Sequence, residues 1–181
     1  MIGLTGPNAA GKGEVARFLV ERGFVYHSLS DAVREEATAR GLDHSRENLI
    51  RVGNELRARF GPGVLAERIS ARIAAHGGAR HVVDSVRSPA EVAVLRALPG
   101  FLLLGIDAPI VVRFERAHAR GRIGDGATFE EFACKEALEN SNDPAAQQLA
   151  QTLALADVVV ANDGTIEDLR ARVERVLETR A

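Results

Sequence analysis

The feature that most constrains the fold of this chain is a glycine-rich turn close to its beginning, Gly6-Pro7-Asn8-Ala9-Ala10-Gly11-Lys12-Gly13. The turn follows a short apolar run at residues 1–5 and precedes a segment in which Val15, Phe18 and Leu19 recur at helical spacing. It therefore matches the pattern G-x-x-x-x-G-K in the strand–turn–helix context that the pattern requires. Such a beginning favours an α/β fold in which a helix starts at the carboxyl end of a strand.

The chemistry of this turn suits a polyphosphate. Small residues allow successive backbone N–H groups to turn inward around phosphate oxygens, and the start of the following helix adds partial positive charge. The ammonium group of Lys12 is placed to reach the β- and γ-phosphates of a nucleotide. We therefore predict a nucleotide-binding set that consists of Asn8, Ala9, Ala10, Gly11, Lys12, Gly13 and Glu14.

The end of the turn departs from the usual pattern. Gly13 stands where Ser or Thr normally ligates magnesium, so we expect Mg²⁺ to rely on phosphate oxygens and on water, several molecules of which it prefers to keep. Glu14 follows in the first helical turn. Its carboxylate has either a metal-related role or only a favourable interaction with the helix dipole.

The rest of the chain alternates short apolar runs with longer amphipathic segments. The further runs lie at residues 24–28, 80–84, 101–107 and 157–162. Several are rich in Val, Ile or Leu without alternation, which is typical of parallel strands covered on both faces. We predict one domain, residues 1–181, with a three-layer α/β fold and a parallel sheet of about five strands. Its last helix is expected to begin at the capping box Thr165-x-x-Asp168.

Two regions between the predicted strands are too long for a single return helix. Residues 31–76 have a helical pattern almost throughout, and residues 109–156 are interrupted at 121–126 and at Pro144. Long insertions at one end of a sheet are where lids and binding arms are usually built. We expect residues 31–76 to form an acceptor-binding helical insertion and residues 109–156 to form a lid with hinges at 121–126.

Composition excludes several classes of protein. Lys and Arg number 23 and Asp and Glu number 25, and this balance argues against a protein that coats nucleic acid or an anionic membrane. The single cysteine, Cys134, excludes an internal disulfide, fits a reducing compartment and is expected to be buried in a helix. The five histidines lack metal-ligand spacing. We expect a cytoplasmic protein with no nucleic-acid or membrane partner.

Residues that are missing narrow the class of nucleotide-binding protein. The sequence has no N-K-x-D guanine motif, which a GTPase needs, and no Glu after Asp84, which a motor or transporter ATPase needs to position water. A small-molecule kinase instead needs several arginines around the transferred phosphoryl group, and this chain has them. Asp84 ends the third predicted strand, at the edge where α/β sheets bind ligands, and is expected to hold a water of the magnesium shell.

One group of residues is expected to hold the phosphoryl acceptor. Arg34 lies one turn into a helix expected to start at Ser30 or Asp31, and Arg87 lies three residues after Asp84. One guanidinium group can bind two phosphate oxygens at once through two parallel hydrogen bonds, which an ammonium group cannot do. Together with Arg57, they form the predicted acceptor-binding set Asp31, Arg34, Arg57 and Arg87. A solvated helix arginine is the alternative for Arg34, and Arg57 is a candidate of the same kind.

A second group of arginines lies in the predicted lid. Arg113, Arg116 and Arg120 share one helix face, where stacked positive charges repel unless an anion or a carboxylate meets them. We expect Arg116 and Arg120 to close on the phosphates and to stabilise the transferred group. A basic face exposed to solvent is the alternative.

The order of these pieces resembles the P-loop nucleotide kinases over nearly the whole chain. The G-K-G ending of the turn is similar to adenylate kinase, and Asp31-x-x-Arg34 resembles the monophosphate-binding helix of that group. Gly-Asn-Glu-Leu-Arg at residues 53–57, combined with Val-Asp-Ser-Val-Arg at 83–87, resembles deoxynucleoside monophosphate kinases and an archaeal kinase-like family. This resemblance implies a P-loop kinase fold.

The tail of the chain, residues 156–165, is similar to dephospho-CoA kinases, in which this loop borders the adenine. The resemblance implies that Asn162 and Gly164 flank the base, with Arg116 or Arg120 on its other side. Dephospho-CoA kinases lack the Asp84-x-x-Arg87 pattern, so the acceptor stays open between the two kinase types.

These patterns predict an ATP-dependent kinase that moves the γ-phosphoryl of MgATP to a small nucleotide-like acceptor, a nucleoside or deoxynucleoside monophosphate. Lys12, Arg116 and Arg120 are the expected catalytic residues. Two alternatives stay open. One is a dephospho-CoA kinase, and the other is an ATP-binding regulatory module that turns over no acceptor.

Overall fold

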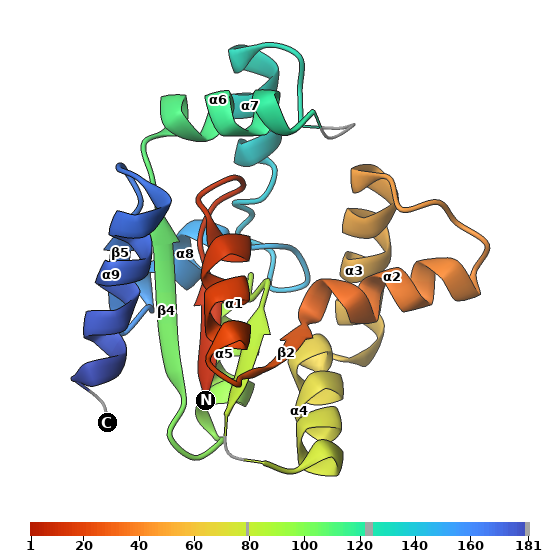
Figure 1. Cartoon of the computed structure of the whole chain (residues 1–181). Helices are drawn as coiled ribbons and strands as arrows, with labels where there is room; N and C mark the ends of the chain where they lie inside the picture. Colours follow the sequence, from red (N-terminus) through yellow and green to blue (C-terminus); the bar gives the residue numbers. More distant parts are fainter. Residues whose placement is uncertain (79, 122–124, 180–181) are drawn as a thin grey trace.

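A computed structural model describes residues 1–78, 80–121 and 125–179 of the chain (Figure 1). The elements in order are β1 (Ile2–Thr5), α1 (Lys12–Glu21), β2 (Val25–Ser28), α2 (Leu29–Ala39), α3 (Arg46–Phe60), α4 (Val64–His76), β3 (His81–Asp84), α5 (Pro89–Arg96), β4 (Leu102–Asp107), α6 (Ile110–Arg120), α7 (Phe129–Ala137), α8 (Leu149–Ala154), β5 (Val158–Ala161) and α9 (Ile166–Glu178). The predicted α/β fold with five parallel strands is confirmed.

The sheet has the strand order β2-β3-β1-β4-β5, so β1 is central and lies between β3 and β4. Gly3 of β1 is level with Val83, and Ser28 of β2 is level with Asp84. The carboxyl ends of β1, β2 and β3 therefore meet at one edge of the sheet. The chain moves to opposite sides of β1 in its first and second halves, and such a reversal opens a crevice at the carboxyl edge.

Two apolar cores cover the two faces of the sheet. Neighbouring strand residues alternate between them: Val82 and Leu104 belong to the core with α1 and α9, whereas Val83 and Leu103 belong to the core with α2–α5. This division produces three layers, with α1 and α9 on one side and α4 and α5 on the other (Figure 1). It also explains the apolar runs of the inner strands β1, β3 and β4, since both of their faces are buried. No helix in the described ranges is long and apolar enough to cross a bilayer.

Both insertions are helical where the structure describes them. Residues 31–76 contain most of α2 and all of α3 and α4, and residues 109–156 contain α6, α7 and α8. Helix α6 ends at Gly121, whose backbone is left-handed with φ 65°. The predicted hinge segment 121–126 falls partly on residues 122–124, which lie outside the described residues.

The expectation that Cys134 is buried is wrong, because its side chain is exposed on α7. The buried residue of that helix is Phe132, whose ring meets Phe114 of α6 at 5.9 Å between centroids. Two residues along an α-helix turn the side chain by about 200°. Cys134 therefore faces away from the α6–α7 contact.

Three histidines from different elements meet beside the sheet. The rings of His27, His76 and His81 lie 5.3–6.5 Å apart between centroids, and the His27 and His81 nitrogens are 3.1 Å apart. Burial lowers the pKa of His27, and the neighbouring His81, His76 and Arg72 lower it further. Within the described residues, no group of three His, Cys, Asp or Glu is arranged to hold a metal ion.

Candidate functional site

The turn between β1 and α1 has a backbone that only small residues can adopt. Gly6 and Gly11 have φ values of 134° and 108°, and a Cβ on Gly6 would lie 2.0 Å from the Ile106 carbonyl oxygen. Ala9 is also left-handed at φ 59°, a conformation that costs an L-residue roughly 1–2 kcal/mol. Strain of this kind concentrates where a loop is shaped for a ligand.

Lys12 lies back over this turn. Its ammonium nitrogen donates to the carbonyl oxygens of Gly6 and Pro7 at 2.6 and 2.8 Å. Burial lowers the pKa of Lys12 to about 8, although the charge of Asp84 opposes the shift. The lysine is thus held by backbone oxygens at the point where it was predicted to meet phosphates.

Asn162, predicted to flank a base, braces the turn from the loop after β5. Its side-chain amide donates to the Ala10 carbonyl at 2.7 Å, and its own N–H donates to Asp107 at 2.7 Å. The Arg116 guanidinium donates in turn to the Asn162 carbonyl at 3.0 Å. Arg116 therefore lies beside the loop that also contains Gly164.

The end of β3 presents Asp84 in a fixed orientation. One carboxylate oxygen accepts from the Ser85 N–H at 2.6 Å, and the other accepts from the Tyr26 hydroxyl at 3.3 Å. Burial and the Asp84 charge raise the pKa of Tyr26 to about 12, so the phenol stays a donor. Ser85 is left-handed at φ 66°, a second strained residue at the carboxyl edge.

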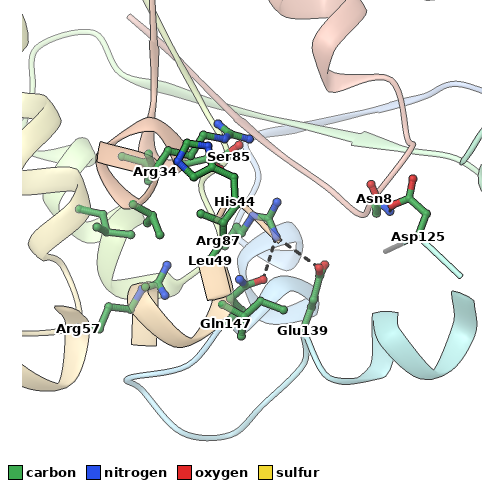
Figure 2. A pocket seen from close by; sticks show the side chains of 16 residues that line it. Asn8, Arg34, His44, Leu49, Arg57, Ser85, Arg87, Asp125, Glu139 and Gln147 are labelled. Atoms are coloured by element: carbon green, nitrogen blue, oxygen red, sulfur yellow. Dashed lines mark hydrogen bonds and ion pairs between the residues drawn. The ribbon is translucent and has the colours of Figure 1, made fainter. Parts of the chain in front are cut away.

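A cavity of about 300 Å³ opens beside the turn (Figure 2). Its walls come from the turn, from α2–α4, from the segment after β3 and from two segments that follow α6. The lining residues are Asn8, Leu29, Ser30, Val33, Arg34, His44, Leu49, Ile50, Gly53, Arg57, Leu65, Ser85, Arg87, Asp125, Glu139 and Gln147. The cavity therefore combines an apolar wall from the helices with three guanidinium groups.

The three predicted acceptor-binding arginines line this cavity but differ in their exposure and in their ion-pair partners. Arg57 is 4% exposed, and its guanidinium is paired with the fully buried Glu91 at 2.8 Å. Glu91 also accepts from the Arg87 N–H at 2.8 Å, so it joins α3 to the segment after β3. Arg34 is nearly half exposed and pairs with Asp31 at 2.7 Å, one turn before it in α2, which begins at Leu29.

Arg87 meets two residues that the sequence did not indicate. One guanidinium nitrogen lies 2.9 Å from the Gln147 side-chain oxygen and 3.4 Å from a Glu139 carboxylate oxygen (Figure 2). Glu139 is almost completely buried, with 3% of its surface exposed. Both residues belong to the connection between α7 and α8, where no motif marks them.

The predicted lid arginines face protein oxygens. Arg113 is buried and pairs with Glu136, with 2.8 Å between Nη2 and Oε1. Arg120 donates to Asp125 at 2.7 Å, and the Asn8 amide donates to the same carboxylate at 3.0 Å. The end of α6 is therefore tied to the tip of the glycine-rich turn, which brings the two predicted phosphate-binding parts together.

Relatives of known sequence cover almost the whole chain, although no protein-family model matches it. A UPF0200 protein of Hyperthermus butylicus is 34% identical over 174 residues, which is 96% of this chain and 91% of its own. A UPF0200 protein of Pyrococcus horikoshii is 34% identical over 181 residues, with coverage of 96% and 94%. The chain belongs to the UPF0200 family. The resemblance to an archaeal kinase-like family agrees with these relatives.

Solved structures that share the fold of this UPF0200 chain include shikimate kinases. The shikimate kinase of Bacteroides thetaiotaomicron superposes with a TM-score of 0.62 at 15% identity, covering 98% of this chain and 97% of its own. The shikimate kinase of Aquifex aeolicus has a TM-score of 0.57 at 16% identity, with coverage of 98% and 96%. A Thermus thermophilus protein has a TM-score of 0.60 at 24% identity, with coverage of 98% and 96%.

Proposed function

We propose that this UPF0200 chain is a kinase that transfers the γ-phosphoryl group of MgATP to a small nucleotide-like acceptor. The observation that carries the proposal is that the strained glycine-rich turn and the cavity with three arginines adjoin one another. Asn8 belongs to the turn and also lines the cavity. A kinase must bring two anionic substrates into line and keep water out. The shikimate kinases and the gluconokinase with a related fold support action on small molecules.

In this proposal the ATP phosphates lie in the glycine-rich turn. Lys12 exchanges its two carbonyl partners for phosphate oxygens, and backbone N–H groups of the turn hold the remaining charge. Arg116 and Arg120 leave their protein oxygens and stabilise the charge of the transferred group. The base lies beside the loop that contains Asn162 and Gly164.

The residues at the carboxyl edge fit magnesium as it is bound with nucleotide phosphates. Mg²⁺ typically takes one or two carboxylates and keeps several waters, and Asp84 supplies a carboxylate whose orientation two donors fix. Gly13 offers no hydroxyl ligand. Asp84 would therefore hold the ion through its water shell, and the ion would supply charge neutralisation between the β- and γ-phosphates.

The acceptor occupies the cavity. Residues 31–76 serve as the acceptor-binding insertion in this proposal, and residues 109–156 serve as the lid. Asp31, Arg34, Arg57 and Arg87 form the acceptor-binding set. Arg34 has only an exposed partner, so an acceptor phosphate can displace Asp31 at little cost. The first candidate acceptor is a nucleoside or deoxynucleoside monophosphate.

Dephospho-CoA is the second candidate, and the buried Glu139 beside Arg87 favours it. A phosphate acceptor attacks through an anionic oxygen and needs no base, whereas the reacting group of dephospho-CoA is a hydroxyl. A carboxylate in the acceptor cavity is suited to the latter. Both candidates carry a phosphate that Arg34 can hold.

The test is the release of ADP from MgATP with a panel of nucleoside monophosphates, deoxynucleoside monophosphates and dephospho-CoA. We expect acceptor-dependent turnover that Lys12→Ala abolishes. Tight ATP binding with no acceptor raising turnover would instead identify an ATP-binding regulatory module and contradict the proposal. Arg17→Ala is a matched control, because Arg17 is an exposed residue of α1 that pairs only with Glu14 in the described structure.

A further inference from the structure

The contact of Arg87 with Glu139 and Gln147 lies next to the phosphate-binding turn. Val86, one residue before Arg87, donates its N–H to Leu4 at 3.1 Å and accepts from the Thr5 hydroxyl at 2.9 Å. Thr5 is the last residue of β1 before the turn begins. The Arg87 guanidinium therefore extends from a backbone that is fixed to the base of the turn.

Glu139 is held in place by the fold of its own segment. Leu149 donates its N–H to the Glu139 carbonyl at 3.1 Å, and Ser141 donates to the Gln147 carbonyl at 2.9 Å. Gln148 donates to the Arg87 carbonyl at 2.9 Å. These backbone bonds close residues 139–149 into a loop and fix it against the segment after β3.

The charge of Glu139 reaches the reacting region. Burial lowers the pKa of the Lys12 ammonium; Asp84 and, to a smaller extent, Glu139 oppose that shift, whereas Arg87 adds to it. The Glu139 carboxylate also lines the cavity that Asn8 and Ser85 share. Glu139 therefore borders the cavity in which the acceptor is proposed to bind.

A buried carboxylate here distinguishes between two kinds of attacking group. The positive charge of Arg87 is already met by Glu139, so a phosphate dianion entering beside them would bring negative charge that this pair does not compensate. A hydroxyl group brings no charge, and it needs a base to accept its proton as the new bond forms. The Gln147 amide adds a donor for a second oxygen of the same molecule.

We propose that the acceptor attacks through a hydroxyl oxygen and that the Glu139 carboxylate accepts the proton of that hydroxyl. The hydroxyl oxygen forms a bond to the γ-phosphorus while the bond from that phosphorus to the bridging oxygen of ATP breaks. The electron pair of the broken bond stays on the ADP β-phosphate, and the proton moves to Glu139. This inference rests on the proposed kinase function and names its substrate class: an alcohol that also carries a phosphate, which Arg34 holds at the exposed end of the cavity.

The first experiment uses the unmodified chain and identifies the product. The protein is incubated with MgATP and each compound of the panel, all of which carry both a phosphate and a sugar hydroxyl, and the product is analysed by ³¹P NMR. We expect a new phosphomonoester signal, as in a nucleoside bisphosphate. A new anhydride signal, as in a nucleoside diphosphate, would overturn the inference and leave the kinase proposal standing. Absence of ADP release with every compound would contradict the kinase proposal itself.

The second experiment tests Glu139 with the acceptor that gives the most product. Glu139→Gln keeps the shape and the contact with Arg87 but cannot accept the proton, so kcat should fall by about 10²–10⁴-fold while the Kd of ATP stays unchanged. Glu139→Asp should recover part of the rate.

Glu130→Gln is the matched control, because Glu130 is an exposed carboxylate on the neighbouring helix α7. It should leave kcat unchanged. A Glu139→Gln protein with the full rate would overturn the role of Glu139. Thermal melting of each variant separates a loss of fold from a loss of the base, and the product analysis of the unmodified chain does not depend on any variant folding.

Discussion

The side-chain amide of Asn162 donates to the backbone carbonyl of Ala10 at 2.7 Å and so ties the loop after β5 to the glycine-rich turn. The two residues are 152 positions apart, and Asn162 is 6% exposed. A buried carbonyl needs such a partner, because leaving one unpaired costs on the order of 1–3 kcal/mol. The shape of the turn therefore depends on a residue from the end of the chain.

Replacing Asn162 with Ala should lower the free energy of unfolding by about 1–3 kcal/mol and weaken nucleotide binding, because the Ala10 carbonyl loses its donor. Urea denaturation measures the first effect and calorimetric titration with ATP measures the second. Asn142→Ala is the control, since Asn142 is an exposed amide in the loop before α8. Equal ATP affinity in both variants would contradict the bracing role of Asn162.

Two glycines of the same turn should respond in opposite ways to alanine. A Cβ on Gly11 would lie 2.2 Å from the Asn162 amide nitrogen, and the backbone there has φ 108°, so Gly11→Ala should abolish ATP binding and destabilise the fold. A Cβ on Gly13 meets nothing within 4 Å. Gly13→Ala should raise the free energy of unfolding by roughly 0.5–1 kcal/mol, since Gly13 lies in α1. Thermal melts with and without ATP compare the pair.

Nucleotide binding should take up protons in mildly alkaline solution. Burial lowers the pKa of Lys12 to about 8 in the free protein, and phosphate oxygens beside its ammonium should raise that pKa again. The bound state then holds more protons than the free state, so ATP affinity should fall as the pH rises through about 8. Calorimetric titrations in two buffers with different ionisation enthalpies count the protons. Lys12→Met should remove the uptake, and uptake that persists in that variant would assign it to another group.

Arg57 and Arg34 should differ in their effect on stability. The Arg57–Glu91 pair is buried, so Arg57→Met leaves a carboxylate without its cation and should lower the free energy of unfolding by about 3–5 kcal/mol. Arg34→Met breaks an exposed pair and should change it by about 0–1 kcal/mol. Urea denaturation of both variants measures the difference. Similar values would show that the Arg57 pair is more hydrated than the structure indicates.

Local patterns predicted the strands within a residue or two of their ends. The run at 80–84 became His81–Asp84, and the run at 101–107 became Leu102–Asp107. These runs are buried on both faces, so their apolar continuity follows directly from the sheet they form. The glycine-rich turn was equally evident, because its spacing places small residues where the backbone has positive φ.

The lining of the cavity could be predicted only in part. Arg34 and Arg87 lie close to the ends of strands, and the apolar runs of the sequence predict where those strands end. Arg87 contacts Glu139 and Gln147, which lie 52 and 60 positions later in the sequence. These two residues belong to a loop whose closure depends on tertiary hydrogen bonds. The prediction that Cys134 is buried was wrong for a related reason. The face of α7 that is buried depends on its contact with Phe114 of another helix.

The three-histidine contact should make the fold sensitive to mild acid. Burial lowers the pKa of His27 in the folded chain, whereas in the unfolded chain it returns to about 6.5. Below that pH the unfolded state takes up a proton that the folded state resists, so stability should fall as the pH falls from about 6.5 toward the lower folded pKa. Urea denaturation between neutral and mildly acidic pH measures the slope. His27→Gln should reduce that slope and His118→Gln, at an exposed site on α6, should not. A slope that survives in the His27 variant would assign the acid sensitivity to other groups.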